Sequence, residues 1–312
     1  MEGKGRAVVT ITPELVHHTG AELGEGPLWW TPRGALVWVD LHAGVVHRLA
    51  IESGSHERWH VNQPVSAVVR RHDGGFLLAL RDGIAEAETF GATPRLVEPI
   101  NPGQPQLRCN DASCDSRGRL WVGTMADDCS PGEGAVYRYT QPGALKQMIA
   151  GTTIANGTAW SPQDDTMYFI DSAHRSIDRF SWEPEEGAIG RRSVFIRTSD
   201  CPGIPDGMAV DADGCLWVAF FGGGAVRRFT PAGQLDTIVT LPVTQVTSCA
   251  FGGTSLDALF ITTARRGLNP EQRREQPLAG DLFACPVSTP GMAVYSFGGS
   301  QTWPAQRPEP VA

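Results

Sequence analysis

One unit recurs six times along the chain: a short apolar strand, a turn carrying Gly or Asp, and a second strand. The second strands are continuous apolar runs that begin at Leu36, Phe76, Leu120, Met167, Leu216 and Leu259. These starts are separated by 40, 44, 47, 49 and 43 residues. A period in the forties with several strands per unit is the sequence signature of a β-propeller. The repeat therefore predicts an all-β fold, a six-bladed β-propeller.

Each repeat has room for four strands. Third strands are visible at 45–51, 135–140, 176–182 and 225–230, and weaker fourth strands follow them. Six blades of about 45 residues use nearly the whole chain, so we expect a single domain over 1–312, with its core at about 20–298 and an irregular tail at 299–312. The N-terminal run VVTITPELV precedes the first innermost strand. We expect it to supply the outer strand of the last blade and so to close the ring.

The connections carry recognisable turn residues. Gly34, Gly75, Gly118 and Gly214 each stand just before a strand, where a hairpin turn needs positive φ. The fourth repeat has Asp164-Asp165 at that place. Two longer insertions, 126–134 in the third blade and a charged segment at 264–280 in the last, are predicted to be loops. A lid over the channel is one interpretation of the second loop, and a solvated loop is the other.

The bulk properties exclude several classes. The net charge of −8 argues against nucleic-acid binding, which needs a basic surface. The sequence contains no run of 18 apolar residues, so no membrane span is expected. The N-terminal segment has no signal-peptide pattern. The seven cysteines are odd in number and include no C-x-x-C pair, so reduced thiols are expected. These features predict a cytoplasmic protein, a monomer or a small homo-oligomer.

A second alignment follows from the repeat. Ten or eleven residues before each second-strand start stand Glu25, Val65, Asn110, Asn156, Asp206 and Ser248. Innermost propeller strands line a central channel, so these side chains should converge at one end of it. Carboxylate and amide oxygens are hard ligands, and the two carboxylates would neutralise a divalent ion. We predict a metal site formed by Glu25, Asn156 and Asp206. A channel in which these residues only hydrogen-bond to one another and to water is the alternative.

Four motifs add a resemblance: LGEGPLWW, RCNDASCDSRGRLWVGTM, NGTAWSPQDDTMYFIDS and PDGMAVDADGCLWVAF. They resemble the senescence marker protein/gluconolactonase/regucalcin family over about residues 20–298. The resemblance implies a six-bladed propeller with one divalent cation that hydrolyses sugar-acid lactones. It implies Glu25, Asn156 and Asp206 as metal ligands, and Arg108 and Asn110 as contacts to substrate hydroxyls. Asp128 falls where the family has an acidic residue that binds substrate or metal-bound water.

The leading functional hypothesis is a metal-dependent sugar lactonase that opens an aldonolactone such as glucono-, galactono-, arabino- or xylonolactone. Asp206 is the expected general base for the attacking water. Ca²⁺ is the first choice of cation, with Zn²⁺, Mg²⁺, Mn²⁺ or Fe²⁺ as alternatives. Two other hypotheses stay open: a calcium-binding propeller without an enzymatic role, and a phosphotriesterase-like hydrolase.

Other reactive side chains carry weaker signals. Cys109 lies beside the predicted site, but no His occupies an equivalent channel position, so pocket lining or core packing is expected. His174 and the pair His17-His18 have no partners at metal-ligand spacing. We interpret these histidines as exposed or as hydrogen-bonded within the protein.

Overall fold

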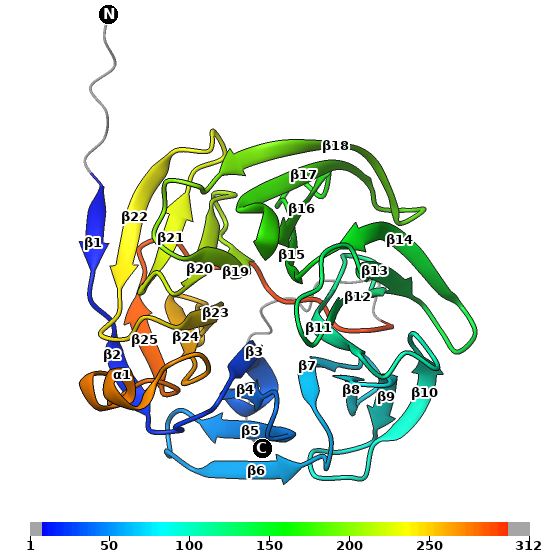
Figure 1. Ribbon diagram of the computed structural model, residues 1–312, viewed down its shortest axis with the longest axis horizontal. Helices are drawn as coiled ribbons and strands as arrows, with labels where there is room; N and C mark the ends of the chain where they lie inside the picture. Colours follow the sequence, from blue (N-terminus) through cyan, green and yellow to red (C-terminus); the bar gives the residue numbers. More distant parts are fainter. Residues whose placement is uncertain (1–7, 299–312) are drawn as a thin grey trace, which may run out of the picture.

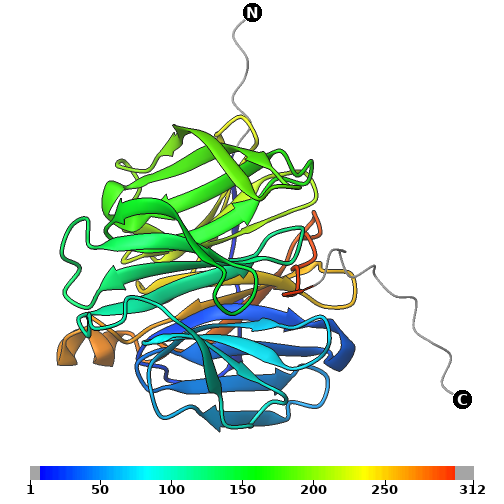
Figure 2. The same ribbon diagram turned by 90° about the vertical axis from the view of Figure 1, so that its right-hand side faces the viewer.

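The computed structural model describes residues 8–298, in which six four-stranded blades surround a central channel (Figure 1). The prediction of a six-bladed, four-stranded β-propeller is confirmed. Seen from the side, the blades form a thick disc (Figure 2). The tail expected at 299–312 lies outside the described residues. No helix in the described range is long and apolar enough to cross a membrane.

Each blade is an antiparallel meander that runs outward from the channel. Blades 1 to 3 are β3 (Gly24–Trp30), β4 (Ala35–Asp40), β5 (Val45–Ala50) and β6 (His56–His60); β7 (Val65–Arg70), β8 (Phe76–Leu80), β9 (Gly83–Ala87) and β10 (Arg95–Pro99); and β11 (Leu107–Cys114), β12 (Leu120–Ala126), β13 (Gly134–Tyr139) and β14 (Leu145–Thr152). Blades 4 and 5 are β15 (Ala155–Trp160), β16 (Thr166–Asp171), β17 (Ser176–Glu183) and β18 (Ala188–Arg197); and β19 (Ile204–Val210), β20 (Leu216–Phe221), β21 (Ala225–Phe229) and β22 (Leu235–Thr240). Blade 6 is β23 (Val246–Gly252), β24 (Ala258–Thr263), β25 (Leu282–Pro286) and β2 (Glu14–His17).

The hydrophobic core lies between blades rather than at the centre. Six clusters of buried apolar side chains occur, one at each contact between neighbouring blades. The second strand of a blade is covered on both faces, and all six residues of β4 and all seven of β12 are buried. This double burial explains why the second strands are continuous apolar runs and why they carried the repeat signal.

The predicted hairpin turns have the expected backbone. Gly118 and Gly214 have φ of 72° and 79°, and Asp164 takes the same left-handed region with φ of 55°. In two blades an Asp opens the turn and organises it. Asp211, for example, accepts hydrogen bonds from the backbone N–H groups of Asp213 and Cys215 and from the indole N–H of Trp217 at 2.9 Å. The turn and the core of the blade are thus joined through one buried carboxylate.

The N-terminal segment closes the ring, as the sequence predicted. β2 pairs antiparallel with β25 and is the outer strand of blade 6. The sequence did not indicate that the preceding strand, β1 (Val9–Ile11), joins a different blade. It pairs in parallel with β22 and extends blade 5 to five strands. The N-terminal run therefore links the outer edges of blades 5 and 6.

Three histidines bridge the contact between the last and first blades, which we call the closing seam. His17 of β2 contacts His56 of β6, with Nε2 and Nδ1 3.2 Å apart. His56 in turn contacts His47 of β5, with Nε2 and Nδ1 3.0 Å apart, and the two rings are stacked. His47 also stacks on Trp38 at 4.9 Å between ring centroids. His17 thus has hydrogen-bond and ring partners within the protein.

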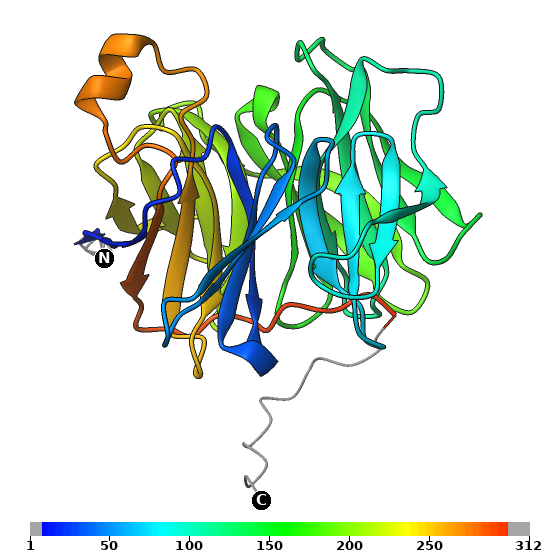
Figure 3. The ribbon, with the colours of Figure 1, turned by 90° about the horizontal axis from the view of Figure 1, so that it is seen from below.

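The two ends of the channel differ (Figure 3). The innermost strands begin at the end that carries α1 (Pro270–Glu275), which lies in the predicted 264–280 loop. We call this end the mouth. At the opposite end, residues 287–297 run across the channel. This C-terminal crossing segment forms isolated bridges from Gly291 to Asp211 and from Phe297 to Arg71, and Phe297 stacks on Tyr139.

Candidate functional site

An irregularity in the innermost strands shapes the mouth. In all six blades the pairing between the first and second strand shifts register near the start of the first strand. The shift follows Glu25 in β3, and it encloses Asn110, Asn156 and Asp206 in β11, β15 and β19. A β-bulge turns side chains away from the regular alternation of a strand. The repeat therefore presents four polar residues together at one end of the channel.

Glycines allow these strands to approach one another. A Cβ atom on Gly157 would lie 2.9 Å from the backbone oxygen of Asp206, and one on Gly207 would lie 2.1 Å from Oγ of Ser248. Both distances are too short for a side chain at either position. The glycine that follows Asn156 and the glycine that follows Asp206 are thus required by close contact with the next blade.

A continuous set of hydrogen bonds joins blades 3 and 4 at the mouth. Nη1 of Arg108 donates to Oδ1 of Asn110 at 2.7 Å. Nδ2 of Asn110 donates to Oδ1 of Asn156 at 2.7 Å, and Nδ2 of Asn156 donates to Oγ of Ser172 at 2.8 Å. Arg108 and Asn156 are only 5% and 8% exposed. The set fixes the amide of Asn156, whose Oδ1 keeps a second lone pair for a further partner.

Glu25 and Asp206 place two carboxylates in one electrostatic environment. Burial, followed by the negative charges of Glu25 and Asp111, raises the pKa of Asp206 well above its usual range. Burial and the charge of Asp111 raise the pKa of Glu25 to about 8, against the opposing effects of the Gly26 N–H and Arg108. Like charges held together away from water favour the neutral acids. A cation between them would relieve this cost.

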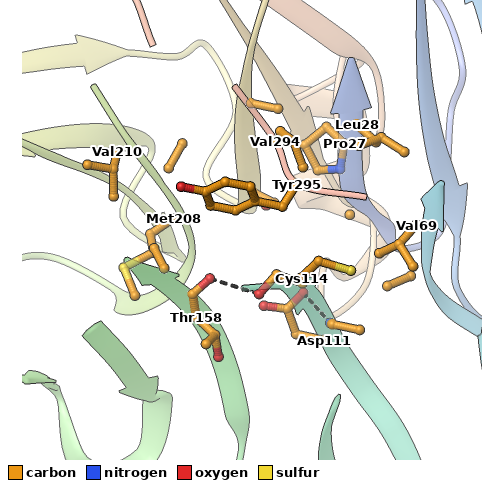
Figure 4. Close-up of a pocket in the computed structure, with 18 of the residues that line it drawn as sticks. Pro27, Leu28, Val69, Asp111, Cys114, Thr158, Met208, Val210, Val294 and Tyr295 are labelled. Carbon is orange, nitrogen blue, oxygen red and sulfur yellow. Dashed lines mark hydrogen bonds between the residues drawn. The ribbon is translucent and has the colours of Figure 1, made fainter. Parts of the chain in front are cut away.

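Asp111 is a member of the cluster that the sequence analysis did not single out. Burial raises its pKa to about 6, although its carboxylate accepts a 2.8 Å hydrogen bond from the N–H of Ala112. Its side chain lines a cavity of about 160 Å³ deeper in the channel, which Tyr295 of the crossing segment enters from the opposite side (Figure 4). The signal was present in the sequence, because Asp111 directly follows Asn110 in a motif that had already been noted.

The two acidic residues after β12 have different surroundings. Asp128 is exposed, and its Oδ1 accepts a 2.9 Å hydrogen bond from the N–H of Ser130, which lowers its pKa. Asp127 forms an ion pair with Arg81 at 2.8 Å and lies 3.4 Å from Nε of Arg108. The structure therefore connects Asp127, rather than Asp128, to the residues at the mouth.

Cys109 lies beside the site but faces a core cluster. The side chain is buried between blades 2 and 3, and burial raises the pKa of its thiol to about 12. A thiol of this kind is not ionised at neutral pH and is a poor nucleophile. Its position agrees with the expected packing role.

Metal binding at the mouth would depend on amide as well as carboxylate oxygen. Within residues 8–298 no group of three or more His, Cys, Asp or Glu side chains is arranged to hold a metal ion. The predicted set contains two such side chains, Glu25 and Asp206, and its third member is the amide of Asn156. Hard oxygen donors of this mixed type suit Ca²⁺, Mg²⁺ or Mn²⁺ better than a thiolate- or imidazole-loving metal.

The fold and this cluster define a class: a six-bladed propeller whose channel mouth carries a cluster of acidic and amide side chains. Residues 23–265 match the SMP-30/Gluconolactonase/LRE-like region, and the chain belongs to that family. The resemblance noted in the sequence is thereby confirmed.

Three relatives illustrate the similarity. Human regucalcin is 32% identical over 93% of this chain and 99% of its own. A 6-deoxy-6-sulfogluconolactonase of Pseudomonas putida is 36% identical over 89% of this chain and 95% of its own. The crystal structure of a calcium-binding protein, regucalcin, from Agrobacterium tumefaciens superposes with a TM-score of 0.89 at 27% identity, covering 93% of this chain and 99% of that one.

Proposed function

We propose that this protein is a hydrolase that opens the lactone ring of a sugar acid with the help of one divalent cation. Family membership supports lactone hydrolysis in general, and the name of the Pseudomonas relative supports a sugar-acid lactone. The observation that carries the proposal is that two carboxylates from blades 1 and 5, Glu25 and Asp206, lie at the bulges of the channel mouth, where burial and then the charge of Glu25 raise the pKa of Asp206. Asn156 from blade 4 completes the proposed set.

The side chains fit a divalent cation. Two carboxylates supply a formal charge of −2. Burial raises the pKa of both, followed by Asp111 for Glu25 and by Glu25 and Asp111 for Asp206, and a cation between them would favour the ionised forms. Oδ1 of Asn156 supplies a neutral third donor. Three protein donors leave coordination positions for substrate and water, whereas calcium buffers use more protein oxygens. Ca²⁺ is our first choice, and Zn²⁺, Mg²⁺, Mn²⁺ and Fe²⁺ are the alternatives to test.

The other side chains have roles that follow from their contacts. Arg108 and Asn110 are held against one another by a 2.7 Å hydrogen bond. Both N–H groups of Asn110 are used within the protein, so Nε of Arg108 is the donor and Oδ1 of Asn110 the acceptor that would meet substrate hydroxyls. Burial keeps this part of the channel poor in water, which strengthens each polar contact to substrate. Substrate orientation is therefore assigned to blade 3, beside the carboxylates of blades 1 and 5.

Ring opening needs one proton to be moved. A water oxygen forms a bond to the lactone carbonyl carbon and gives a proton to the carboxylate of Asp206. The bond from that carbon to the ring oxygen then breaks, and the proton passes to the departing alkoxide, so that water and lactone become one hydroxy acid. A bound divalent cation would supply charge stabilisation for the carbonyl oxygen as it becomes negative.

The test is a panel of lactones combined with elemental analysis. Purified protein should contain a stoichiometric divalent metal, and it should release acid from at least one of glucono-, galactono-, arabino- or xylonolactone faster than the spontaneous rate. Chelation should abolish the excess rate, and restoring the metal should recover it. A protein that binds metal but hydrolyses none of these lactones would instead support the calcium-binding alternative, to which the name of the Agrobacterium structure points. A phosphotriester added to the panel tests the third hypothesis.

A further inference from the structure

The rim of the mouth brings together three arginines and a histidine from four consecutive blades. Blade 6 reaches blade 1 through a bridge between Ala264 and Leu23, and the N–H of Arg266 donates to the backbone oxygen of Glu22 at 2.8 Å. On the other side of the same segment, the N–H of Leu41 donates to the oxygen of Leu23 at 2.9 Å. Arg266 and His42 therefore flank one short stretch of backbone.

The rim continues into blades 2 and 3. The N–H of Val65 donates to the oxygen of Leu41 at 3.1 Å, which brings blade 2 against the turn that carries His42. Arg81 follows the second strand of that blade, and its guanidinium holds Asp127 of blade 3 with two contacts of 2.8 and 3.2 Å. Asp127 also lies 3.4 Å from Nε of Arg108. Arg266, His42, Arg81 and Arg108 thus follow one another around the mouth.

Several polar atoms on this rim have no hydrogen-bond partner in the part of the chain that the structure describes. Nε2 of His42 and Nε of Arg108 are buried and make no hydrogen bond within residues 8–298. The exposed guanidinium of Arg266 also has no hydrogen bond or ion pair among the described residues. The neighbouring arginines are occupied, since Arg265 donates to the oxygen of Ala279 and Arg273 pairs with Glu22.

The balance of charge on the rim is positive although the protein carries a net charge of −8. Burial, followed by Arg266 and Arg108 and then by Arg81, lowers the pKa of His42 to about 4, while Asp127 opposes the shift. His42 is therefore a neutral imidazole at pH 7. The charged groups that act on it are three guanidinium groups and one carboxylate, which leaves positive charge for a ligand to neutralise.

We propose that Arg266 and His42, backed by the positive charge of Arg81, bind an anionic group on the lactone, a sulfonate or a phosphate carried on the carbon farthest from the lactone carbonyl. The inference rests on the proposed lactonase function, and it names the substrate class. Arg108 lies between Asn110 on the channel side and Asp127 on the rim side. A lactone whose carbonyl lies at Glu25 and Asp206 would have its hydroxyls at Arg108 and its far end at the rim. Guanidinium groups match the oxygens of both anions.

The direct test compares a neutral lactone with its charged analogues. Wild-type protein loaded with the metal found by elemental analysis is assayed on glucono-1,5-lactone and on the 6-phosphate and 6-sulfonate forms of that lactone. We expect kcat/KM for at least one charged lactone to exceed that for the neutral one by about tenfold or more. In Arg266→Gln this ratio should fall by about ten- to a hundredfold, the loss typical of a charge-assisted hydrogen bond. Arg274→Gln, on the same loop, is the matched control and should leave both constants unchanged.

A binding measurement separates this inference from the proposed function. Calorimetry with 6-phosphogluconate, 6-sulfogluconate and gluconate should show tighter binding of the charged acids, and Arg266→Gln should remove the difference. If the protein hydrolyses no lactone but retains this Arg266-dependent binding, the lactonase proposal fails and the anion site stands. If it hydrolyses neutral and charged lactones equally, and Arg266→Gln changes neither, the anion site is overturned and the lactonase proposal stands. Preference for phosphate or for sulfonate identifies the source of the anion.

Discussion

The channel mouth and the closing seam both bury ionisable groups, and they do so with opposite chemistry. At the mouth, burial and like charge raise the pKa of Glu25 to about 8 and raise that of Asp206 well above its usual range. At the seam, burial is the first cause that lowers the pKa of His47 to about 3 and that of His56 to about 4. In each place the neutral form is favoured.

The two regions differ in what completes them. The neutral imidazoles of the seam satisfy one another through ring nitrogens 3.0 and 3.2 Å apart and stack on Trp38. The carboxylates of the mouth have Arg108 as the basic side chain that offsets them, and it acts weakly on both. The seam is complete as it stands, which is typical of a structural cluster. The carboxylates of the mouth would be stabilised by a cation, which is typical of a functional site.

The largest effect that would sharpen this contrast is on catalysis. We expect Asp206→Asn to lower kcat/KM for the best lactone by about 10²- to 10⁴-fold, because the proton acceptor for the attacking water is lost. The measurement is acid release with saturating divalent cation. His56→Gln, at the seam, is the control and should keep wild-type turnover. Near-normal turnover in a metal-loaded Asp206→Asn protein would remove Asp206 from its assigned role.

The next largest effect should be on folding, and at the seam alone. His47 is 5% exposed, stacks on Trp38 and hydrogen-bonds to His56. His47→Ala should therefore lower the free energy of unfolding by about 2–4 kcal/mol through a cavity and a lost hydrogen bond. Denaturant unfolding monitored by tryptophan fluorescence measures it. The exposed His60 lies on the neighbouring strand β6, and His60→Ala should change stability little. Equal losses in the two variants would show that the seam is not a special structural cluster.

The order of stability of wild type and a Glu25 variant should reverse when a metal ion is added. In chelator at pH 7, Glu25→Gln should be more stable than wild type by about 1 kcal/mol, because folding of the wild-type chain requires Glu25 to take up a proton that the unfolded chain does not hold. With cation at about 100 times its dissociation constant, wild type should gain about 2.7 kcal/mol and become the more stable protein. Thermal unfolding with and without metal gives both values. An unchanged order in the two conditions would contradict the assignment of Glu25 as a ligand.

The smallest effect should be a loss of stability in mild acid that originates at the seam. The folded-state pKa values of His47 and His56 lie below the ordinary value of 6.5, so the unfolded chain binds their protons first. The free energy of unfolding should therefore be highest above pH 6.5 and fall as the pH drops towards 4. The other charged groups that act on these rings are Arg58, His60, Glu57, Asp281 and His18.

The check on that acid effect is a pH series of denaturant midpoints. His56→Gln removes one titrating ring and should flatten the fall between pH 6.5 and 4 by about 1 kcal/mol. His60→Ala serves again as the control for a general change in surface charge. A fall of the same steepness in all three proteins would place the acid sensitivity elsewhere.

The sequence predicted the parts of the fold that repeat. The second strands start within one residue of their predicted positions because each is buried on both faces and so had to be a continuous apolar run. The positions of Glu25, Asn156 and Asp206 at the mouth followed from the same period. Closure by β2 was predicted from the general need to cover a sheet edge.

The features that the repeat did not predict are those that occur once. The parallel pairing of β1 with β22 and the crossing segment at 287–297 have no counterpart in other blades. His17 and His56 are 39 residues apart and meet only when the ring closes. Asp111 was overlooked because its strand had already contributed Asn110, and the alternation of side chains along a regular strand gives no reason to expect both at one bulge.

The C-terminal crossing segment affects how small molecules can enter and leave the channel. Many ring-shaped proteins have a channel open at both faces, but here residues 287–297, Tyr295 among them, run across the far end of the channel. If the channel is closed at one end, substrate and product must enter and leave through the same mouth. The ring-opened acid would then leave past Arg266 and Arg81, where the next substrate molecule arrives. Turnover would depend on the rate of product release through the mouth.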